Sequence, residues 1–177
     1  MDIQIDSREK PQAIQKIIQE FDREGINYFR SKLPVGDYMS LDNARLSIDR
    51  KQNLGELVGN VCQQHERFKK ELIKAQKIGV QLVILVEHGA DIQTLEDVFF
   101  WQNPRKHEIR WRTNKQTGKR EKYVVSEKAV DGEQLYKSLC TIKDRYNVRF
   151  EFCTKNETGK RIIEILSNDS GRDQTKQ

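Results

Sequence analysis

Acidic and basic side chains gather in one short stretch of the chain, GDYMSLDNARLSIDRK, which holds Asp37, Asp49 and Lys51. Asp49 and Lys51 are two residues apart, so on a β-strand both would leave the same face, with Arg50 on the other. Asp37 begins the preceding strand, and hairpin pairing would bring it towards Asp49. Carboxylates bind Mg²⁺ or Mn²⁺, which acidifies its water and polarises a phosphoryl oxygen, while a lysine stabilises the developing charge. The stretch therefore predicts metal-dependent phosphodiester hydrolysis.

A second polar group supports this interpretation. Taken alone, D-x-K on a strand is more often a surface ion pair than a site. Asp6, Arg8 and Glu9, however, follow the first expected strand, at the carboxyl end where α/β sheets place their sites. The alternative is a solvated strand-to-helix turn in which Glu9 favours the helix N-terminus.

The elements that would position these residues alternate between strand and helix patterns. Expected strands cover residues 2–6, 27–33, 38–42, 44–51, 81–87 and 148–153, and expected helices cover 13–21, 54–79, a short stretch after Thr94, 131–146 and 162–166. This pattern predicts an α/β fold with a mixed central sheet flanked by helices. We expect one domain over residues 1–166, with a basic insertion at 105–122 and a disordered polar tail at 167–177.

Three linked motifs, IDSRE, LPVGDY and IDRK, resemble the nuclease domain of the XPF-type structure-specific endonucleases, which belong to the PD-(D/E)xK superfamily. That family has D-x-R-E at the end of its first strand and a GD followed, after a strand, by E-R-K. The agreement covers roughly residues 3–90. The resemblance implies a restriction-endonuclease-like fold and Mg²⁺- or Mn²⁺-dependent cleavage of DNA, with branched or flapped DNA as the substrate.

The resemblance also assigns roles to residues of this chain. It makes Asp37 and Asp49 the metal ligands, Lys51 the catalytic lysine, and Asp6, Arg8 and Glu9 supporting site residues, while Arg50 matches the middle of E-R-K. A basic residue and an aromatic recur early in the family's next helix, and Arg67 and Phe68 correspond to them. We expect Arg67 to contact a phosphate and Phe68 to be part of the core.

The chain departs from the family pattern at two positions. Asp49 replaces a glutamate, which shortens the arm that would reach the metal by one bond. Gly55 stands where the family has an aspartate, four residues after the lysine. Glu56 either substitutes for that aspartate or is an exposed helix residue.

Positive charge is concentrated in one segment, residues 105–122, which holds eight Lys/Arg and two Glu. This window carries +6, and the rest of the chain sums to −1. The segment is either a polyanion contact or a solvated hairpin, and an aromatic among the cations favours nucleic acid. We expect it to replace the helix-hairpin-helix module of many relatives. The predicted DNA-binding residues are Arg67, Arg110, Trp111, Arg112, Lys119 and Arg120.

Composition excludes several classes of protein. The 177 residues are 36% hydrophobic and 33% charged, and the N-terminus has no signal-peptide pattern. The longest apolar run, 82–86, is too short for a bilayer, and no Walker loop predicts a nucleotide cofactor. Three scattered cysteines match neither a disulfide framework nor a zinc pattern, so we expect buried free thiols. The expected location is intracellular, cytoplasmic or nucleoid-associated.

Two other functions remain open at this point. The chain could be a catalytically inactive DNA-binding or scaffolding domain of the same fold, although Asp37, Asp49 and Lys51 are all present. A small RNA-binding protein is the third possibility, but no RNA module is recognisable. A homodimer or a partner subunit is compatible with the sequence, and so are roles in repair, recombination, and phage or mobile-element replication.

Overall fold

The computed structural model describes residues 1–126 and 128–168, and its central strand is the uninterrupted apolar run β5 (Gln81–Glu87). Leu82, Ile84 and Val86 face one core, while Val83 and Leu85 face a second core on the other side of the sheet. A strand that is covered on both faces has no polar face, which explains why its sequence does not alternate.

Six strands form one mixed sheet in the order β2-β1-β3-β4-β5-β8. Its other members are β1 (Asp2–Asp6), β2 (Asn27–Ser31), β3 (Tyr38–Ser40), β4 (Asn43–Lys51) and β8 (Arg149–Cys153). β3 is antiparallel to β1 and β4, whereas β1–β2, β4–β5 and β5–β8 are parallel pairs. The expected α/β architecture with a mixed sheet is therefore confirmed.

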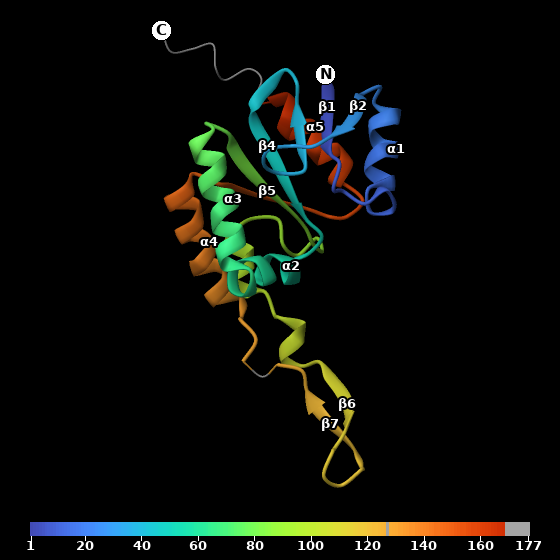
Figure 1. Cartoon of the computed structure of the whole chain (residues 1–177), viewed down its shortest axis with the longest axis vertical. Helices are drawn as coiled ribbons and strands as arrows, with labels where there is room; N and C mark the ends of the chain where they lie inside the picture. The colour runs from blue at the N-terminus through green and yellow to red at the C-terminus, as the bar shows by residue number, and fades with distance from the viewer. Residues whose placement is uncertain (127, 169–177) are drawn as a thin grey trace.

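Helices cover both faces of this sheet (Figure 1). One layer contains α2 (Leu54–Val58), α3 (His65–Lys77) and α4 (Gly132–Tyr146), and the other contains α1 (Gln15–Arg23) and α5 (Thr158–Asn168). No helix within residues 1–126 and 128–168 combines the length and apolar character needed to span a bilayer.

The prediction of a single long helix over residues 54–79 is wrong. The structure has α2, a π-helical turn η2 (Gly59–Gln63) and then α3. A π-turn takes more residues than an α-turn, so it rotates the apolar stripe: Val61 is half-buried and Cys62 is exposed, while Phe68 returns to the core. The expectation that all three free cysteines are buried therefore holds only at Cys153, since Cys62 is exposed and Cys140 is half-buried.

Other boundaries differ by a few residues. The expected strands 27–33 and 38–42 end at Ser31 and Ser40, and a 3-10 turn, η1 (Pro11–Ala13), precedes α1. The stretch after Thr94 forms the 3-10 helix η3 (Glu96–Phe100), and α5 is longer at both ends than residues 162–166. Of the expected tail 167–177, residues 169–177 lie outside the part that the structure describes.

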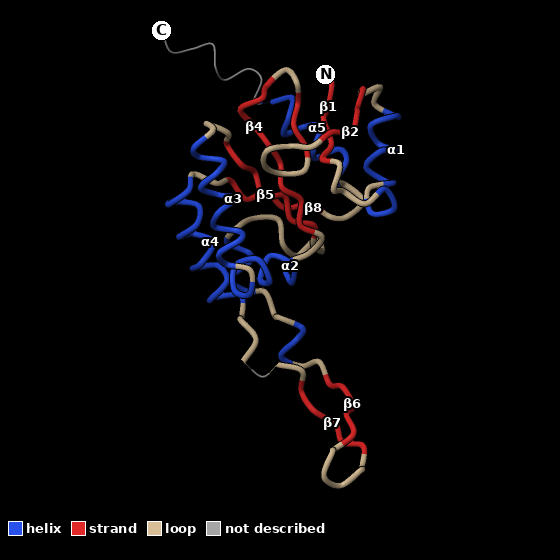
Figure 2. Tube along the Cα trace, viewed as in Figure 1, coloured by secondary structure: helices blue, strands red, loops and turns tan. Residues whose placement is uncertain are grey.

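The basic segment forms a hairpin that projects from the body (Figures 1 and 2). Its strands, β6 (Ile109–Thr113) and β7 (Arg120–Val124), make a separate antiparallel sheet after the short helix η4 (Pro104–Lys106). The side-chain amide of Asn103 donates to the backbone oxygen of Val130 (2.8 Å), which closes the base of the projection.

Candidate active site

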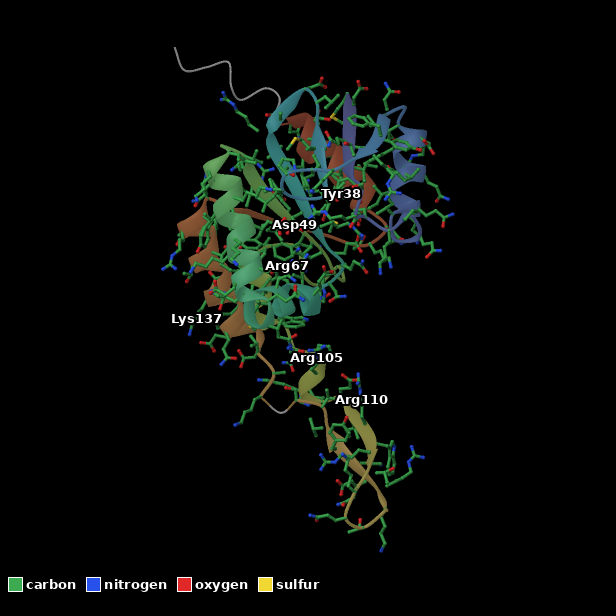
Figure 3. All side chains as sticks on the ribbon, viewed as in Figure 1. Tyr38, Asp49, Arg67, Arg105, Arg110 and Lys137 are labelled. Carbon is green, nitrogen blue, oxygen red and sulfur yellow. The ribbon has the colours of Figure 1, made fainter. Side chains whose placement is uncertain are left out.

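A polar cavity of about 370 Å³ lies where β1 and β4 end and where η2 and α3 begin. Two groups of residues line it: Arg8, Glu9, Asp37, Asp49, Arg50 and Lys51 from the sheet side, and Glu56, Asn60, Gln64, Arg67, Phe68 and Glu71 from the helical side. Figure 3 shows Asp49 and Arg67 close together in the body of the protein. The cavity therefore contains six of the seven residues predicted for catalysis.

Pairing of β3 with β4 places Asp37 beside the end of β4. The Asp37 backbone N–H donates to the Ile48 oxygen (2.7 Å), and the Arg50 backbone N–H donates to Asp37 Oδ2 (2.8 Å). Gly36 has φ +70°, and a Cβ there would lie 2.3 Å from Ser47 Oγ. The glycine of LPVGDY is therefore required for this close approach.

Asp49 and Lys51 share the face of β4 that α3 covers. Lys51 Nζ donates to Asp49 Oδ1 (2.8 Å) and lies 5.7 Å from the Phe68 ring centroid. Both side chains are almost fully buried. The second carboxylate oxygen, Asp49 Oδ2, is buried and accepts no hydrogen bond from any residue in the described part of the chain. Burial without a donor leaves this oxygen available to a cation.

The electrostatics of the site also favour a cation. Burial raises the pKa of Asp37 well above its usual range, and the negative charges of Asp49 and Glu9 raise it further. Burial also raises the pKa of Asp49, and Glu71 adds to the increase while Lys51 opposes it. Burial lowers the pKa of Lys51, but the hydrogen bond and charge of Asp49 together with the charges of Asp37 and Glu56 outweigh this effect, so the net shift is upward. The ammonium stays charged, and it balances only part of the buried negative charge.

The donor set fits a hard divalent cation with an incomplete protein shell. No group of three or more His, Cys, Asp or Glu side chains within residues 1–126 and 128–168 has the arrangement of a metal site. Asp37 and Asp49 nevertheless offer carboxylate oxygens that face the same cavity. Mg²⁺ is commonly held by one or two carboxylates, with waters and substrate phosphate completing its octahedron. The residues present therefore fit Mg²⁺ or Mn²⁺.

Arg50 leaves the opposite face of β4, as its position between Asp49 and Lys51 predicts. Its buried guanidinium donates to Glu87 Oε1 (2.8 Å) and to Glu9 Oε2 (2.9 Å). Glu87 Oε1 also accepts from the Thr158 hydroxyl (3.1 Å). Arg50 therefore links the end of β1 to β5 and α5, and it fixes Glu9 at the rim of the cavity.

Asp6 lies behind the cavity and does not line it. Its buried carboxylate accepts from Arg8 Nε (2.7 Å), from the Arg8 backbone N–H (2.8 Å) and from the Leu33 backbone N–H (2.7 Å). Burial alone would raise the pKa of Asp6, but these hydrogen bonds outweigh it and the pKa is lowered. Asp6 therefore positions Arg8 and ties β1 to the loop that leads to Asp37.

Two glutamates of this network were not predicted. Glu87 ends the apolar run of β5, and a carboxylate at the end of a buried strand could have been recognised from the sequence as a candidate site residue. Glu71 lies one helical turn beyond Arg67, and its Oε1 accepts weakly from the Gly36 backbone N–H (3.4 Å). Glu56 is exposed and lines the cavity, while its Oε2 accepts from the Gln52 backbone N–H (2.9 Å). Its carboxylate is thus engaged at the start of α2.

The predicted DNA-binding residues fall into two places. Arg67 lies on the wall of the cavity. The other five, Arg110, Trp111, Arg112, Lys119 and Arg120, belong to the projecting hairpin. Figure 3 shows Arg105 at the root of this projection and Arg110 just beyond it, where the hairpin begins.

Comparisons with known proteins agree with this fold. The family model of the ERCC4 domain matches residues 5–165. XPF from Aeropyrum pernix aligns with a TM-score of 0.60 at 12% identity, over 97% of this chain and 66% of that one. XPF from Aeropyrum pernix in complex with DNA aligns with a TM-score of 0.59 at 13% identity, over 96% and 64%. The chain thus spans less than two thirds of each structure, and curated proteins give no match.

Proposed function

The chain belongs to the ERCC4 domain family, a family of DNA nucleases, and we propose that it is a Mg²⁺- or Mn²⁺-dependent endonuclease that cuts branched or flapped DNA. One observation supports the metal dependence above all others. Asp49 has a buried carboxylate oxygen to which no described residue donates a hydrogen bond, in a cavity that Asp37 and Lys51 also line.

In the proposed mechanism, Asp37 and Asp49 hold the divalent cation. A bound cation would supply Lewis-acid polarisation of the scissile phosphoryl oxygen and would make water at the site more acidic. Lys51 stays protonated because of its pairing with Asp49, so its ammonium can neutralise charge that develops on the phosphate. Its position is fixed by the Asp49 carboxylate and the Phe68 ring.

Two arginines on different walls of the cavity are suited to hold the DNA backbone. Arg8 is positioned by Asp6, and Arg67 projects from α3. Both guanidiniums are exposed enough to meet a phosphate on either side of the scissile bond. Arg50 and Glu9 are positioning residues in this proposal, because their charges are paired with each other.

The deciding experiment is cleavage of labelled duplex, flap, fork, four-way-junction and single-stranded DNA with Mg²⁺, Mn²⁺ or EDTA. Asp37→Asn and Lys51→Ala are compared with wild type. Asp42→Asn and Lys137→Ala are matched controls at exposed positions. Metal-dependent cutting that only the two site variants abolish supports the proposal. Tight binding without any cutting would identify an inactive DNA-binding or scaffolding domain.

The proposal extends to the setting of the enzyme. We propose one nuclease domain over residues 1–166 that acts inside the cell, in repair, recombination, or phage or mobile-element replication. It would work as a monomer, as a homodimer or beside a partner subunit. Sedimentation with and without fork DNA distinguishes these assemblies.

A further inference from the structure

The β6–β7 hairpin has two chemically different faces. Trp111 pairs with Lys122 across the ribbon, and Thr113 pairs with Arg120. Alternation along each strand places these four side chains on one face, which we call the tryptophan face. The tryptophan face also carries the apolar residues Ile109 and Val124, which pair with each other across the ribbon.

The opposite face is neutralised by its own carboxylates. Arg112 Nε donates to Glu121 Oε1 (2.7 Å), and Arg110 Nε donates to Glu108 Oε1 (2.7 Å). The Arg112 guanidinium also lies 5.2 Å from the Tyr123 ring centroid. A polyanion gains little from cations that are already paired.

The cations of the tryptophan face are available by contrast. Within residues 1–126 and 128–168, neither Arg120 nor Lys122 has a carboxylate partner. Their cationic groups lie 5.7 Å and 5.2 Å from the Trp111 ring centroid. Trp111 is 54% exposed, whereas the other tryptophan, Trp101, is 9% exposed. An exposed indole beside two cations that pair with no described carboxylate suits a base that stacks and phosphates that flank it.

The face favours an unpaired nucleotide over a duplex groove. Base edges in a groove are read mainly by hydrogen-bonding side chains such as Arg, Asn and Gln. Here both cations are drawn towards the ring, and Ile109 and Val124 add apolar surface beside it. Apolar and aromatic groups meet the face of a base, and that face is exposed only where the strand is unpaired.

A second hollow lies between the candidate active site and the hairpin. A second cavity, of about 550 Å³, lies between the start of α2 and the root of the hairpin, and Asn53, Arg105 and Glu108 are among its lining residues. Glu56 lines both this cavity and the active-site cavity. Glu56 therefore lies between the two hollows, which mark a route by which a DNA strand could run from the site to the hairpin root.

We infer that the hairpin is a DNA-binding arm with one working face, on which an unpaired nucleotide stacks on Trp111 while Arg120 and Lys122 contact the adjoining phosphates. This inference rests on the proposed function, because it takes DNA as the substrate. It removes Arg110 and Arg112 from the predicted DNA-binding residues, because both lie on the neutralised face.

The test measures binding in EDTA, so that no cleavage occurs. The probes are a fluorescein-labelled fork with oligo(dT) arms and a blunt duplex of equal length. Trp111→Ala should weaken fork binding by roughly tenfold and duplex binding by less than about twofold, since stacking is lost only where bases are unpaired. Trp111→Phe retains a ring and should restore most of the affinity.

A second set of variants compares the charges on the two faces of the hairpin directly. Arg120→Gln with Lys122→Gln should reduce the slope of log affinity against log salt for the fork by about 1.4, as expected for two single-strand phosphate contacts. Arg110→Gln with Arg112→Gln removes the same formal charge from the other face and should leave the slope within about 0.5 of wild type. Equal effects of the two pairs would overturn the assignment.

Two further outcomes separate this inference from the proposed function. If Trp111→Ala lowered the affinity for fork and duplex equally, or left the fork affinity unchanged, the inference about the hairpin would be overturned. Metal-dependent cleavage by the wild type would still support the proposed endonuclease. If fork binding depended on Trp111 but the protein cut no DNA, the inference about the hairpin would stand and the proposed endonuclease activity would be rejected. Oligo(dT) should also quench tryptophan fluorescence in wild type and not in Trp111→Phe.

Discussion

The active-site cavity and the projecting hairpin both concentrate charge, but they hold it in opposite ways. In the cavity, the Arg50 side chain is 2% exposed and bridges Glu9 and Glu87. In the hairpin, Arg112 is 62% exposed beside Glu121, although the ion-pair distance is as short, at 2.7 Å. Burial strengthens each interaction and fixes its geometry, as chemistry requires, while exposure leaves the hairpin pair solvated by water, so it contributes little to stability.

The largest expected effect follows from removing the ammonium in the cavity. Lys51→Ala should lower the rate of DNA cleavage by about 10²–10³-fold, because it removes a preorganised charge next to the scissile phosphate. Fork affinity in EDTA should stay within about twofold of wild type, since binding is spread over many backbone contacts. Single-turnover kinetics and anisotropy separate the two quantities. A parallel loss of both would show that Lys51 only binds DNA.

The next effect compares ion pairs of the two regions. Arg50→Ala leaves Glu9 and Glu87 without their cation and should reduce the free energy of unfolding by about 3–5 kcal/mol. The matched change in the hairpin, Arg112→Ala, should cost about 0–1 kcal/mol, because water already solvates that pair. Urea denaturation of both variants at pH 7 checks this. Similar costs would remove the distinction between the regions.

Metal binding should stabilise the cavity and leave the hairpin unaffected. Mg²⁺ at about 100 times its dissociation constant should raise the melting temperature by about 5–10 °C. Asp49→Asn should abolish most of the rise, whereas Asp42→Asn, the same change at an exposed turn, should keep it. Calorimetry with Mg²⁺ or EDTA gives the answer without any cleavage assay. An undiminished rise in Asp49→Asn would place the cation elsewhere.

The smallest effect concerns Asp131, which lies between the two regions. Asp131 caps α4 by accepting from the Gln134 backbone N–H (2.9 Å), and it pairs with Lys106 at the hairpin root (3.2 Å). These contacts lower its pKa, with the cap as the larger cause. Because the folded-state pKa is below the ordinary 3.8, the stabilisation is present above that pH and is lost as pH falls through the lower folded value.

Melting curves of wild type and Asp131→Ala test this linkage. The variant should melt a few degrees lower at pH 7, and the difference should shrink as the pH is lowered below 3.8. Asp131→Asn keeps a capping oxygen that does not titrate, so it should recover part of the loss, and its melting temperature relative to Asp131→Ala should not depend on pH. A difference that is independent of pH would exclude the charge of Asp131 as its origin.

Local pattern was enough to predict the strands and the centre of the site. Residues 2–6 and 81–87 form strands with the expected bounds, because alternation and an unbroken apolar run are properties of the strand itself. Asp37, Asp49 and Lys51 converge as their spacing predicts, since register on neighbouring strands fixes which side chains meet.

Contacts that join distant segments were not predictable in this way. Glu87 meets Arg50 only because β4 and β5 are neighbours in the sheet, and Glu71 reaches the site only after the π-turn rotates α3. The sequence also grouped Arg112 with Arg120 by charge alone. Their separation onto two faces depends on the hairpin register, which pairs Arg112 with Glu121.

The closure between Asn103 and Val130 has a consequence for how such a nuclease can diversify. This hydrogen bond joins the two chain segments where they leave the body, and the hairpin beyond it forms a sheet of its own. Residues 104–129 can therefore be shortened, lengthened or exchanged while the sheet and its carboxylates keep their positions. Selection can then change which DNA is held without altering how the bond is broken, so the hairpin is a natural place for grafting new substrate preferences.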